Sequence, residues 1–195
     1  MGRQKKYGCV NRQTNRSFMK DQSERVKTKD VIVVPYNEEW PAEFNKIKEL
    51  IAGALGSAAI SIEHVGSTSV AGLWAKPIID IDVVIKDESI LSRVIEQLDS
   101  IGYHFRGDLG IQDRYAFRCE DMPHLMSHHL YVCPQYSKEL KRHLCFRDYL
   151  RSHPEAVQKY SEVKREGAAL FPHDIDAYIN YKTSVIEEIY RMCGL

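Results

Sequence analysis

The chain has 195 residues, 44% of them hydrophobic, and its 27 Lys and Arg residues balance 27 Asp and Glu residues. This composition predicts an ordinary globular domain with a real core, and the lack of any run of about 18 apolar residues excludes a membrane-spanning helix. The five cysteines are scattered and form no C-x-x-C pair. We therefore expect no disulfide framework, no structural zinc site and a reducing, cytoplasmic setting.

The first 30 residues are basic, with nine Lys and Arg residues against three Asp and Glu residues. Because this segment has few hydrophobic residues and no helix or strand periodicity, we expect residues 1–29 to form a disordered arm and residues 30–195 to form the domain. A basic arm could contact nucleic acid or acidic lipid. The remaining residues are net acidic, which argues against a broad nucleic-acid groove, so nucleic acid is expected as a partner only through the arm.

Order is predicted to begin at the β-branched run 31–34 and to continue with an amphipathic helix that starts near Pro41 and ends near Gly56. Further strands are predicted at residues 59–65, 78–85, 103–105, 114–119 and 128–133, and further helices at 90–98, 137–150, 154–170 and after Asp174. The last helix has a predicted apolar stripe of Tyr178, Tyr181, Val185, Ile189 and Met192. This order predicts an α/β protein of the α+β type: a mixed β-sheet flanked by helices, with a helical C-terminal part.

Asp80 and Asp82 interrupt the very apolar segment 78–85. Residues i and i+2 of a strand point to the same face, so the two carboxylates lie together. Two buried carboxylates repel each other and lose hydration, which a divalent cation such as Mg²⁺ or Mn²⁺ would compensate. The alternative is a pair of aspartates near a strand end that are neutralised by Lys or Arg.

A glycine turn, Gly66-Ser67-Thr68-Ser69, follows the apolar segment that ends at Val65. Glycine lets the backbone approach a phosphate, and hydroxyls and free N–H groups then contact its oxygens. The motif alone is equally typical of an ordinary Ser/Thr turn. The motif indicates a phosphate site because of its spacing to the carboxylates. Twelve residues separate Ser67 from Asp80, and Lys76 lies between the turn and the carboxylates.

Three histidines lie close in the sequence, at His124, His128 and His129. The first two have the i, i+4 spacing of zinc ligands on a helix, but no glutamate completes H-E-x-x-H and the surroundings favour a loop and a strand. In a strand, His128 and His129 would face opposite sides. No G-x-S-x-G motif occurs, so a Ser-His-Asp hydrolase is not indicated.

The turn, the spacer and Asp80-Ile81-Asp82-Val83 together resemble the signature of the polymerase-β-like nucleotidyltransferase superfamily. The longer segments 62–73 and 76–81, together with 128–132, 146–151 and 178–182, resemble the GrpB family (UPF0157), which is also found fused to some dephospho-CoA kinases. The resemblance covers about residues 31–192. It implies a nucleotidyltransferase-like fold in which the turn holds nucleotide phosphates and Asp80 and Asp82 bind metal.

A third carboxylate usually completes such a site, and the sequence does not place it, because the strand that would supply it carries His128-His129. His129 is therefore a candidate metal or phosphate ligand. Lys76, Arg114 and Lys182 are candidate phosphate ligands, although a lone basic residue is more often a surface charge.

Three hypotheses follow. The first is a metal-dependent nucleotidyltransferase that moves a nucleotidyl group from a nucleoside triphosphate to an unknown acceptor. The second is a protein that binds a nucleotide or a coenzyme A-type phosphate without turnover. The third is a nucleic-acid binder that acts through the basic arm.

Overall fold

A computed structural model describes residues 30–119 and 122–195, so the predicted arm at residues 1–29 lies outside the described residues. The helices are α1 (Trp40–Leu55), α2 (Leu91–Asp99), α3 (Lys138–Ser152), α4 (Pro154–Leu170) and α5 (Ile175–Met192). The strands are β1 (Ser61–Val65), β2 (Ile79–Ile85), β3 (Tyr103–Phe105), β4 (Tyr115–Cys119) and β5 (His128–Pro134). Short 3-10 turns occur at η1 (Gly56–Ala58), η2 (Ser67–Ser69) and η3 (Glu88–Ile90).

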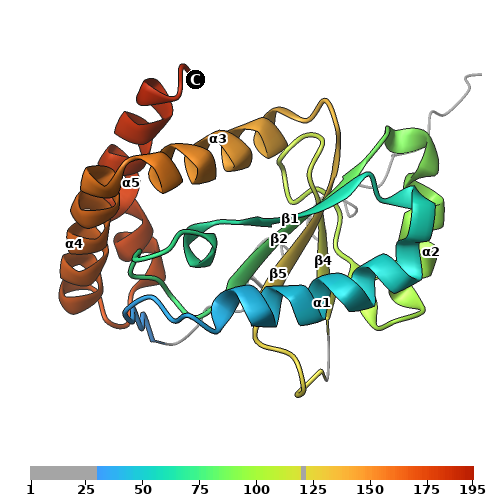
Figure 1. Ribbon diagram of the computed structural model, residues 1–195, viewed down its shortest axis with the longest axis horizontal. Helices are drawn as coiled ribbons and strands as arrows, with labels where there is room; N and C mark the ends of the chain where they lie inside the picture. The colour runs from blue at the N-terminus through green and yellow to red at the C-terminus, as the bar shows by residue number, and fades with distance from the viewer. Residues whose placement is uncertain (1–29, 120–121) are drawn as a thin grey trace, which may run out of the picture.

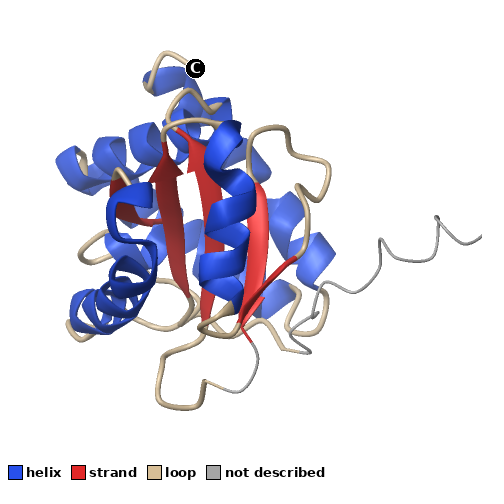
Figure 2. Ribbon diagram, turned by 90° about the vertical axis from the view of Figure 1, so that its right-hand side faces the viewer, coloured by secondary structure: helices blue, strands red, loops and turns tan. Residues whose placement is uncertain are grey.

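The five strands form one mixed sheet in the order β1-β2-β5-β4-β3. β2 runs parallel to β5, and the other neighbouring pairs are antiparallel. Figure 2 shows the strands side by side, with helices on both sides of the sheet. β2 and β5 are the central strands, and this position explains why the segment around Asp80 is so apolar.

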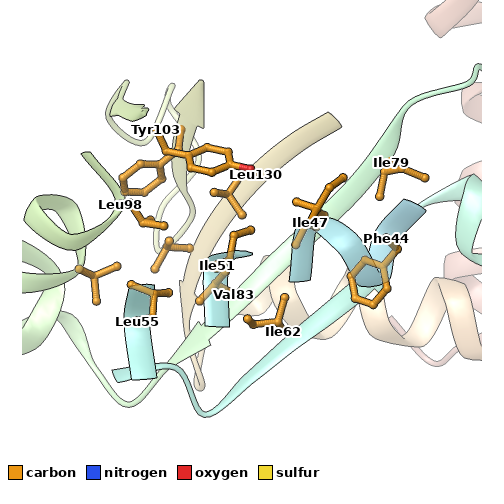
Figure 3. Close-up of a cluster of buried hydrophobic side chains, with 14 of the residues drawn as sticks. Phe44, Ile47, Ile51, Leu55, Ile62, Ile79, Val83, Leu98, Tyr103 and Leu130 are labelled. Atoms are coloured by element: carbon orange, nitrogen blue, oxygen red, sulfur yellow. The ribbon is translucent and has the colours of Figure 1, made fainter. Parts of the chain in front are cut away.

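The main core lies between the sheet and the helices α1 and α2. Alternate residues of β2 face these helices and are fully buried: Ile79, Ile81, Val83 and Ile85. Figure 3 shows Ile47, Ile51 and Leu55 of α1 packing with Leu98, Tyr103 and Leu130 in this cluster. The apolar stripe of α1 therefore fixes one face of the sheet and leaves the opposite face for other contacts.

The helices α3, α4 and α5 form a second cluster at the end of the sheet that carries η2 (Figure 1). Val70 and Leu73, which follow the glycine turn, are buried among Phe146, Leu150 and Tyr160 of these helices. The C-terminal helices consequently hold the turn against the sheet.

The β-branched run 31–34 joins no strand of the sheet. Val31 N–H donates to the carbonyl of Pro172 (2.8 Å), and Val34 makes an isolated bridge to Ala75. Two different segments satisfy the backbone of this run, so no ladder forms. The predicted stripe of α5 is correct only in part, because Met192 is 65% exposed and Tyr181 is exposed, whereas Tyr178, Val185 and Ile189 are buried. Near the end of the helix, Tyr190 and Cys193 rather than Met192 pack on the second cluster.

Candidate functional site

The glycine turn lies directly against Asp80. Gly66 has φ 66°, and a Cβ at this position would lie 2.2 Å from Asp80 Oδ2. Only a residue without a side chain allows the backbone and the carboxylate to approach so closely. The backbone of the turn is therefore in direct contact with the start of β2.

A buried lysine anchors the turn from α4. Lys164 Nζ donates hydrogen bonds to Ser67 Oγ (2.6 Å) and to the carbonyl of Trp74 (2.8 Å), and its side chain is almost fully buried. Its Nζ also lies 4.8 Å from the ring centroid of Tyr160. Burial lowers the pKa of Lys164 well below its ordinary value. A cation in this environment is costly unless an anion compensates it.

The hydroxyl of Thr68 is turned into the protein. It donates to the carbonyl of Ile78 (3.2 Å) and accepts from His64 Nε2 (3.1 Å), while His64 stacks on Phe44 with 4.6 Å between ring centroids. Burial lowers the pKa of His64 to about 4, so it is neutral near pH 7. Thr68 therefore stabilises the turn through its side chain, and any contact with a phosphate would use its backbone.

Asp82 lies at the base of the site and is fully buried. Its Oδ2 accepts from His143 Nδ1 of α3 (2.7 Å), and His143 Nε2 lies 3.4 Å from Glu139 Oε1. Burial lowers the pKa of His143, but its bonds to Asp82 and Glu139 outweigh this and raise it to about 9. Burial raises the pKa of Asp82, against the opposing effect of His143. Its Oδ1 has no hydrogen-bond partner among the described residues.

Asp80 lies at the mouth of the site, with 33% of its side chain exposed. Its Oδ1 accepts from His129 Nδ1 (2.9 Å), and this bond raises the pKa of His129. Burial by itself raises the pKa of Asp80, but the bond from His129 and the positive charges of His129, His143 and Lys182 together outweigh burial and lower it. The predicted alternative, neutralisation by Lys or Arg, is thus replaced by one histidine partner for each aspartate.

Two further lysines approach the same region. Lys182 of α5 has its Nζ 4.8 Å from the ring centroid of Tyr178, and burial lowers its pKa to about 8. Lys76 is half-buried before β2, and burial also lowers its pKa. The negative charge of Asp80 opposes this effect of burial and raises the pKa of all three lysines, Lys76, Lys164 and Lys182. Three lysines therefore lie within electrostatic reach of the carboxylate that contacts the turn, and one of them, Lys164, binds the turn directly.

β5 supplies no carboxylate beside the aspartates. In the parallel register, His129 lies opposite Asp80 and Tyr131 lies opposite Asp82. Arg114 precedes β4, which β5 separates from β2, and its guanidinium carbon lies 4.4 Å from the ring centroid of Tyr131. In the described part of the chain, no group of three or more His, Cys, Asp or Glu side chains is arranged to hold a metal ion.

The paired histidines of β5 face opposite sides, as predicted. His128 Nε2 lies 2.7 Å from the hydroxyl of Tyr103 on the core side, and its Nδ1 lies 2.8 Å from the carbonyl of Met126. His129 faces Asp80. His128 is thus engaged in the core, away from the carboxylate face.

The structure brings Gly66, Ser67, Thr68, Lys76, Asp80, Asp82, His129 and Lys182 together, with Arg114 next to Tyr131. Sequence analysis missed Lys164 and His143. A signal for Lys164 exists: it shares the buried face of α4 with Tyr160, Ser161 and Gly167, where a charged residue is unusual. His143 likewise lies between Leu140 and Phe146, two buried residues of α3.

The chain is similar to known proteins over most of its length. A protein-family model described as GrpB protein matches residues 30–192. UPF0157 protein YqkA of Bacillus subtilis is 36% identical over 80% of the chain, and UPF0157 protein PA4798 of Pseudomonas aeruginosa is 38% identical over 80%. The matches span 45% and 65% of the lengths of these two relatives.

Two solved structures are similar to the chain. The crystal structure of the conserved protein GrpB from Enterococcus faecalis has a TM-score of 0.72 and 29% identity, covering 84% of this chain and all of that one. A Cid1 poly(U) polymerase structure with bound MgGTP has a TM-score of 0.51 and 10% identity, covering 70% of this chain and 44% of that one. The second similarity concerns the fold alone, which is nucleotidyltransferase-like. The chain belongs to the GrpB family.

Proposed function

We propose that this protein is a metal-dependent nucleotidyltransferase that moves a nucleotidyl group from a nucleoside triphosphate to an acceptor. The observation that carries the proposal is the arrangement of opposite charges around one glycine turn. Asp80 lies against Gly66 and Asp82 follows it on β2, whereas Lys164 binds Ser67, and Lys76 and Lys182 lie within electrostatic reach of Asp80. A metal–triphosphate complex has the complementary arrangement, because its cation suits the carboxylates and its phosphates suit the lysines.

The carboxylate side fits a divalent ion in one specific respect. Each histidine occupies one oxygen of its aspartate, and the buried Asp82 Oδ1 is left without a partner among the described residues. An unpaired buried carboxylate oxygen is costly in the absence of a ligand. Asp80 and Asp82 would hold Mg²⁺ or Mn²⁺. When bound, such an ion would neutralise charge on the phosphates.

The lysine side fits the phosphates. Ser67 is held by Lys164 at the edge of the turn, and burial keeps water away from the lysine side chain. Charged hydrogen bonds to phosphate oxygens are strong in such surroundings. Lys76 and Lys182 would bind the outer phosphates, so that an acceptor hydroxyl attacks the α-phosphorus in line with the bond to the leaving pyrophosphate.

A second candidate is a protein that binds a nucleotide or a coenzyme A-type phosphate without turnover. One observation favours it: His129 and Tyr131 take the β5 positions beside the aspartates, where a third carboxylate would be expected. The lysines and the turn would serve such a protein equally well.

The test has two steps. Thermal unfolding is first followed with Mg²⁺ or Mn²⁺ and each of the four ribonucleoside triphosphates, because a ligand at a hundredfold excess over Kd stabilises the native state by about 2.7 kcal/mol. Pyrophosphate release is then measured with the best pair and a cell extract as the source of acceptor. Release supports the enzyme, and binding without release supports the second candidate.

A matched pair of variants on α4 controls for general charge effects. Lys164→Met removes the buried cation at Ser67, whereas Lys159→Met removes an exposed lysine that pairs with Glu188 (2.6 Å). We expect nucleotide stabilisation to be lost in the first variant and kept in the second. Equal behaviour of the two variants would contradict the assignment of the phosphate site.

A further inference from the structure

β1 is the terminal strand of the sheet, on the side away from β5. It pairs with β2, and among the described residues no further strand lies beside its other edge. An edge strand presents backbone N–H and C=O groups that can pair with another extended chain, and proteins usually cover or block such an edge. Figure 1 shows β1 between α1 and α3, which pass on either side of it.

A groove of about 520 Å³ runs along this edge. It is lined by six consecutive residues, 59–64, which place the strand along its floor. Residues of α1 and α3 form its walls. This volume lies within the range of binding pockets, about 300–1,000 Å³, and a strand as floor with helices as walls is the arrangement that accepts an added peptide strand.

The two ends of the groove differ in chemistry. One end is lined by the small or apolar residues Ala52, Gly56, Ala59 and Ile60, and Ile60 is 57% exposed. The other end is lined by Phe44 and His64, by the cations Lys48, Arg147 and Arg151, and by one carboxylate, Glu63, so its charged residues are net positive. A ligand that matches both ends has an apolar group at one end and negative charge at the other.

The cations at the second end are not equivalent. Arg147 is already paired, with Glu63 (2.8 Å) and Asp148 (2.7 Å), and it also donates to the carbonyl of His64 (3.3 Å). Arg147 therefore occupies the backbone carbonyl of His64, at the cationic end of the β1 edge. Arg151 donates to the carbonyl of Ser69, a neutral acceptor, and both Arg151 and Lys48 are exposed. Their positive charge therefore remains available to a ligand.

We propose that this groove binds an extended acidic peptide, which pairs with the outward-facing backbone of Ile62 in β1 and directs a carboxylate toward Lys48 and Arg151. The groove borders the glycine turn, because Arg151 binds the carbonyl of Ser69, but the proposal does not depend on nucleotide binding. Charge decides between possible occupants. The first 30 residues of the chain carry a net +6, so they would be repelled by the cationic end.

The test uses the full chain and a fluorescein-labelled probe of alternating sequence, (Glu-Val)4, in fluorescence anisotropy. Two control probes are a (Lys-Val)4 peptide and a (Glu-Val)4 peptide in which alternate backbone nitrogens are methylated along one edge. We expect saturable binding of the first probe alone, because the controls lack the matching charge or the backbone donors. Hydrogen exchange at the amide of Ile62, which faces away from β2, should slow when the first probe is bound, whereas that of Ile60, which already donates to the carbonyl of Val84, should not change.

Matched variants on α1 locate the site. Lys48→Glu should weaken binding by about tenfold or more, the equivalent of about 1.4 kcal/mol, whereas Lys46→Glu, an exposed lysine that does not line the groove, should change it little. Ala52→Glu at the apolar end should also weaken binding, with Ala42→Glu as its control. Both pairs are at exposed positions, so unfolding is not expected.

Several results would overturn the proposal. Equal binding of the Lys-Val or methylated probe would exclude charge selection or strand pairing. Displacement of the probe by a synthetic peptide of residues 1–29 would assign the groove to the chain's own N-terminal segment. Concentration-dependent dimerisation that the probe abolishes would assign it to a second copy, and an absence of binding would remove the site.

Discussion

The face of the sheet toward α1 and α2 and the face toward α3 differ sharply, although β2 contributes to both. Toward α1 and α2 the strand places isoleucines and a valine that are fully buried among apolar neighbours. Toward α3 it places Asp80 and Asp82, each with a histidine partner. The first face is stabilised by burial of apolar surface, whereas the second holds charges that are costly without a ligand. The contrast separates the residues that make the fold from those available for binding.

The largest effect is expected on the apolar face. Ile81→Ala removes a fully buried side chain and should lower the free energy of unfolding by about 2–5 kcal/mol. Ile60→Ala, at an exposed isoleucine just before β1, should change the free energy of unfolding by less than about 0.5 kcal/mol. Urea denaturation measures both. Similar values for the two variants would mean that this face is not the stabilising core.

An intermediate effect is expected where the turn meets Asp80. Gly66→Ala must adopt φ 66° and place its Cβ against Asp80 Oδ2, so we expect a loss of about 1–3 kcal/mol from strain together with loss of nucleotide stabilisation. Gly72→Ala has a similar φ of 78° but no atom within 4 Å of the added Cβ. The difference between the variants isolates the contact with Asp80. No difference would show that backbone strain alone matters.

A smaller, pH-dependent effect is expected at Lys182. Its folded pKa of about 8 lies below the value of about 10.4 in an unfolded chain. Between these values the unfolded state binds more protons, so the contribution of Lys182 to stability rises with pH, and below about pH 8 it is constant and unfavourable. Lys182→Met should therefore be more stable than the natural protein at pH 7, by a margin that shrinks toward pH 10.

Guanidinium denaturation at several pH values measures this margin, with Lys159→Met as the control for an exposed lysine. A margin that stays constant from pH 7 to pH 10 would contradict a lowered pKa for Lys182.

The smallest effect is expected from residues 1–29, which have no apolar periodicity. Deleting them should leave the melting temperature within a few degrees, since few buried contacts would be lost. Scanning calorimetry of the two chains measures the shift. A shift of about 10 °C or more would show that the segment packs on one of the two faces.

The apolar face was the easier one to predict from sequence. The stripe of α1, the ends of α4 and the apolar pattern of β2 follow from local periodicity, proline and glycine, and the structure agrees at Trp40–Leu55, Pro154–Leu170 and Ile79–Ile85. Local pattern is sufficient there because burial of a whole stripe decides the outcome.

The polar face was predicted only in part. Gly66-Ser67 and the two aspartates were found because they are close in sequence and match a known signature. His143 is 61 residues from Asp82 and Lys164 is 97 residues from Ser67, so tertiary packing of the C-terminal helices decides these pairs. A charged residue on a buried helix stripe was the available signal, and it could not name the partner.

The most direct test of the central claim is ligand-dependent unfolding of Asp82→Asn at pH 8. At this pH His143 of the variant, which keeps Glu139 as its only charged partner among the described residues, can be neutral, and the substitution removes a buried charge whose Oδ1 has no partner there either. We expect ligand-free stability to change by less than about 1 kcal/mol, while the stabilisation of about 2.7 kcal/mol by saturating Mg²⁺ and nucleoside triphosphate is lost. If Asp82→Asn is stabilised as much as the natural protein, or if it loses about 3–5 kcal/mol without ligand as a broken structural ion pair would, then Asp82 is not part of a metal–nucleotide site.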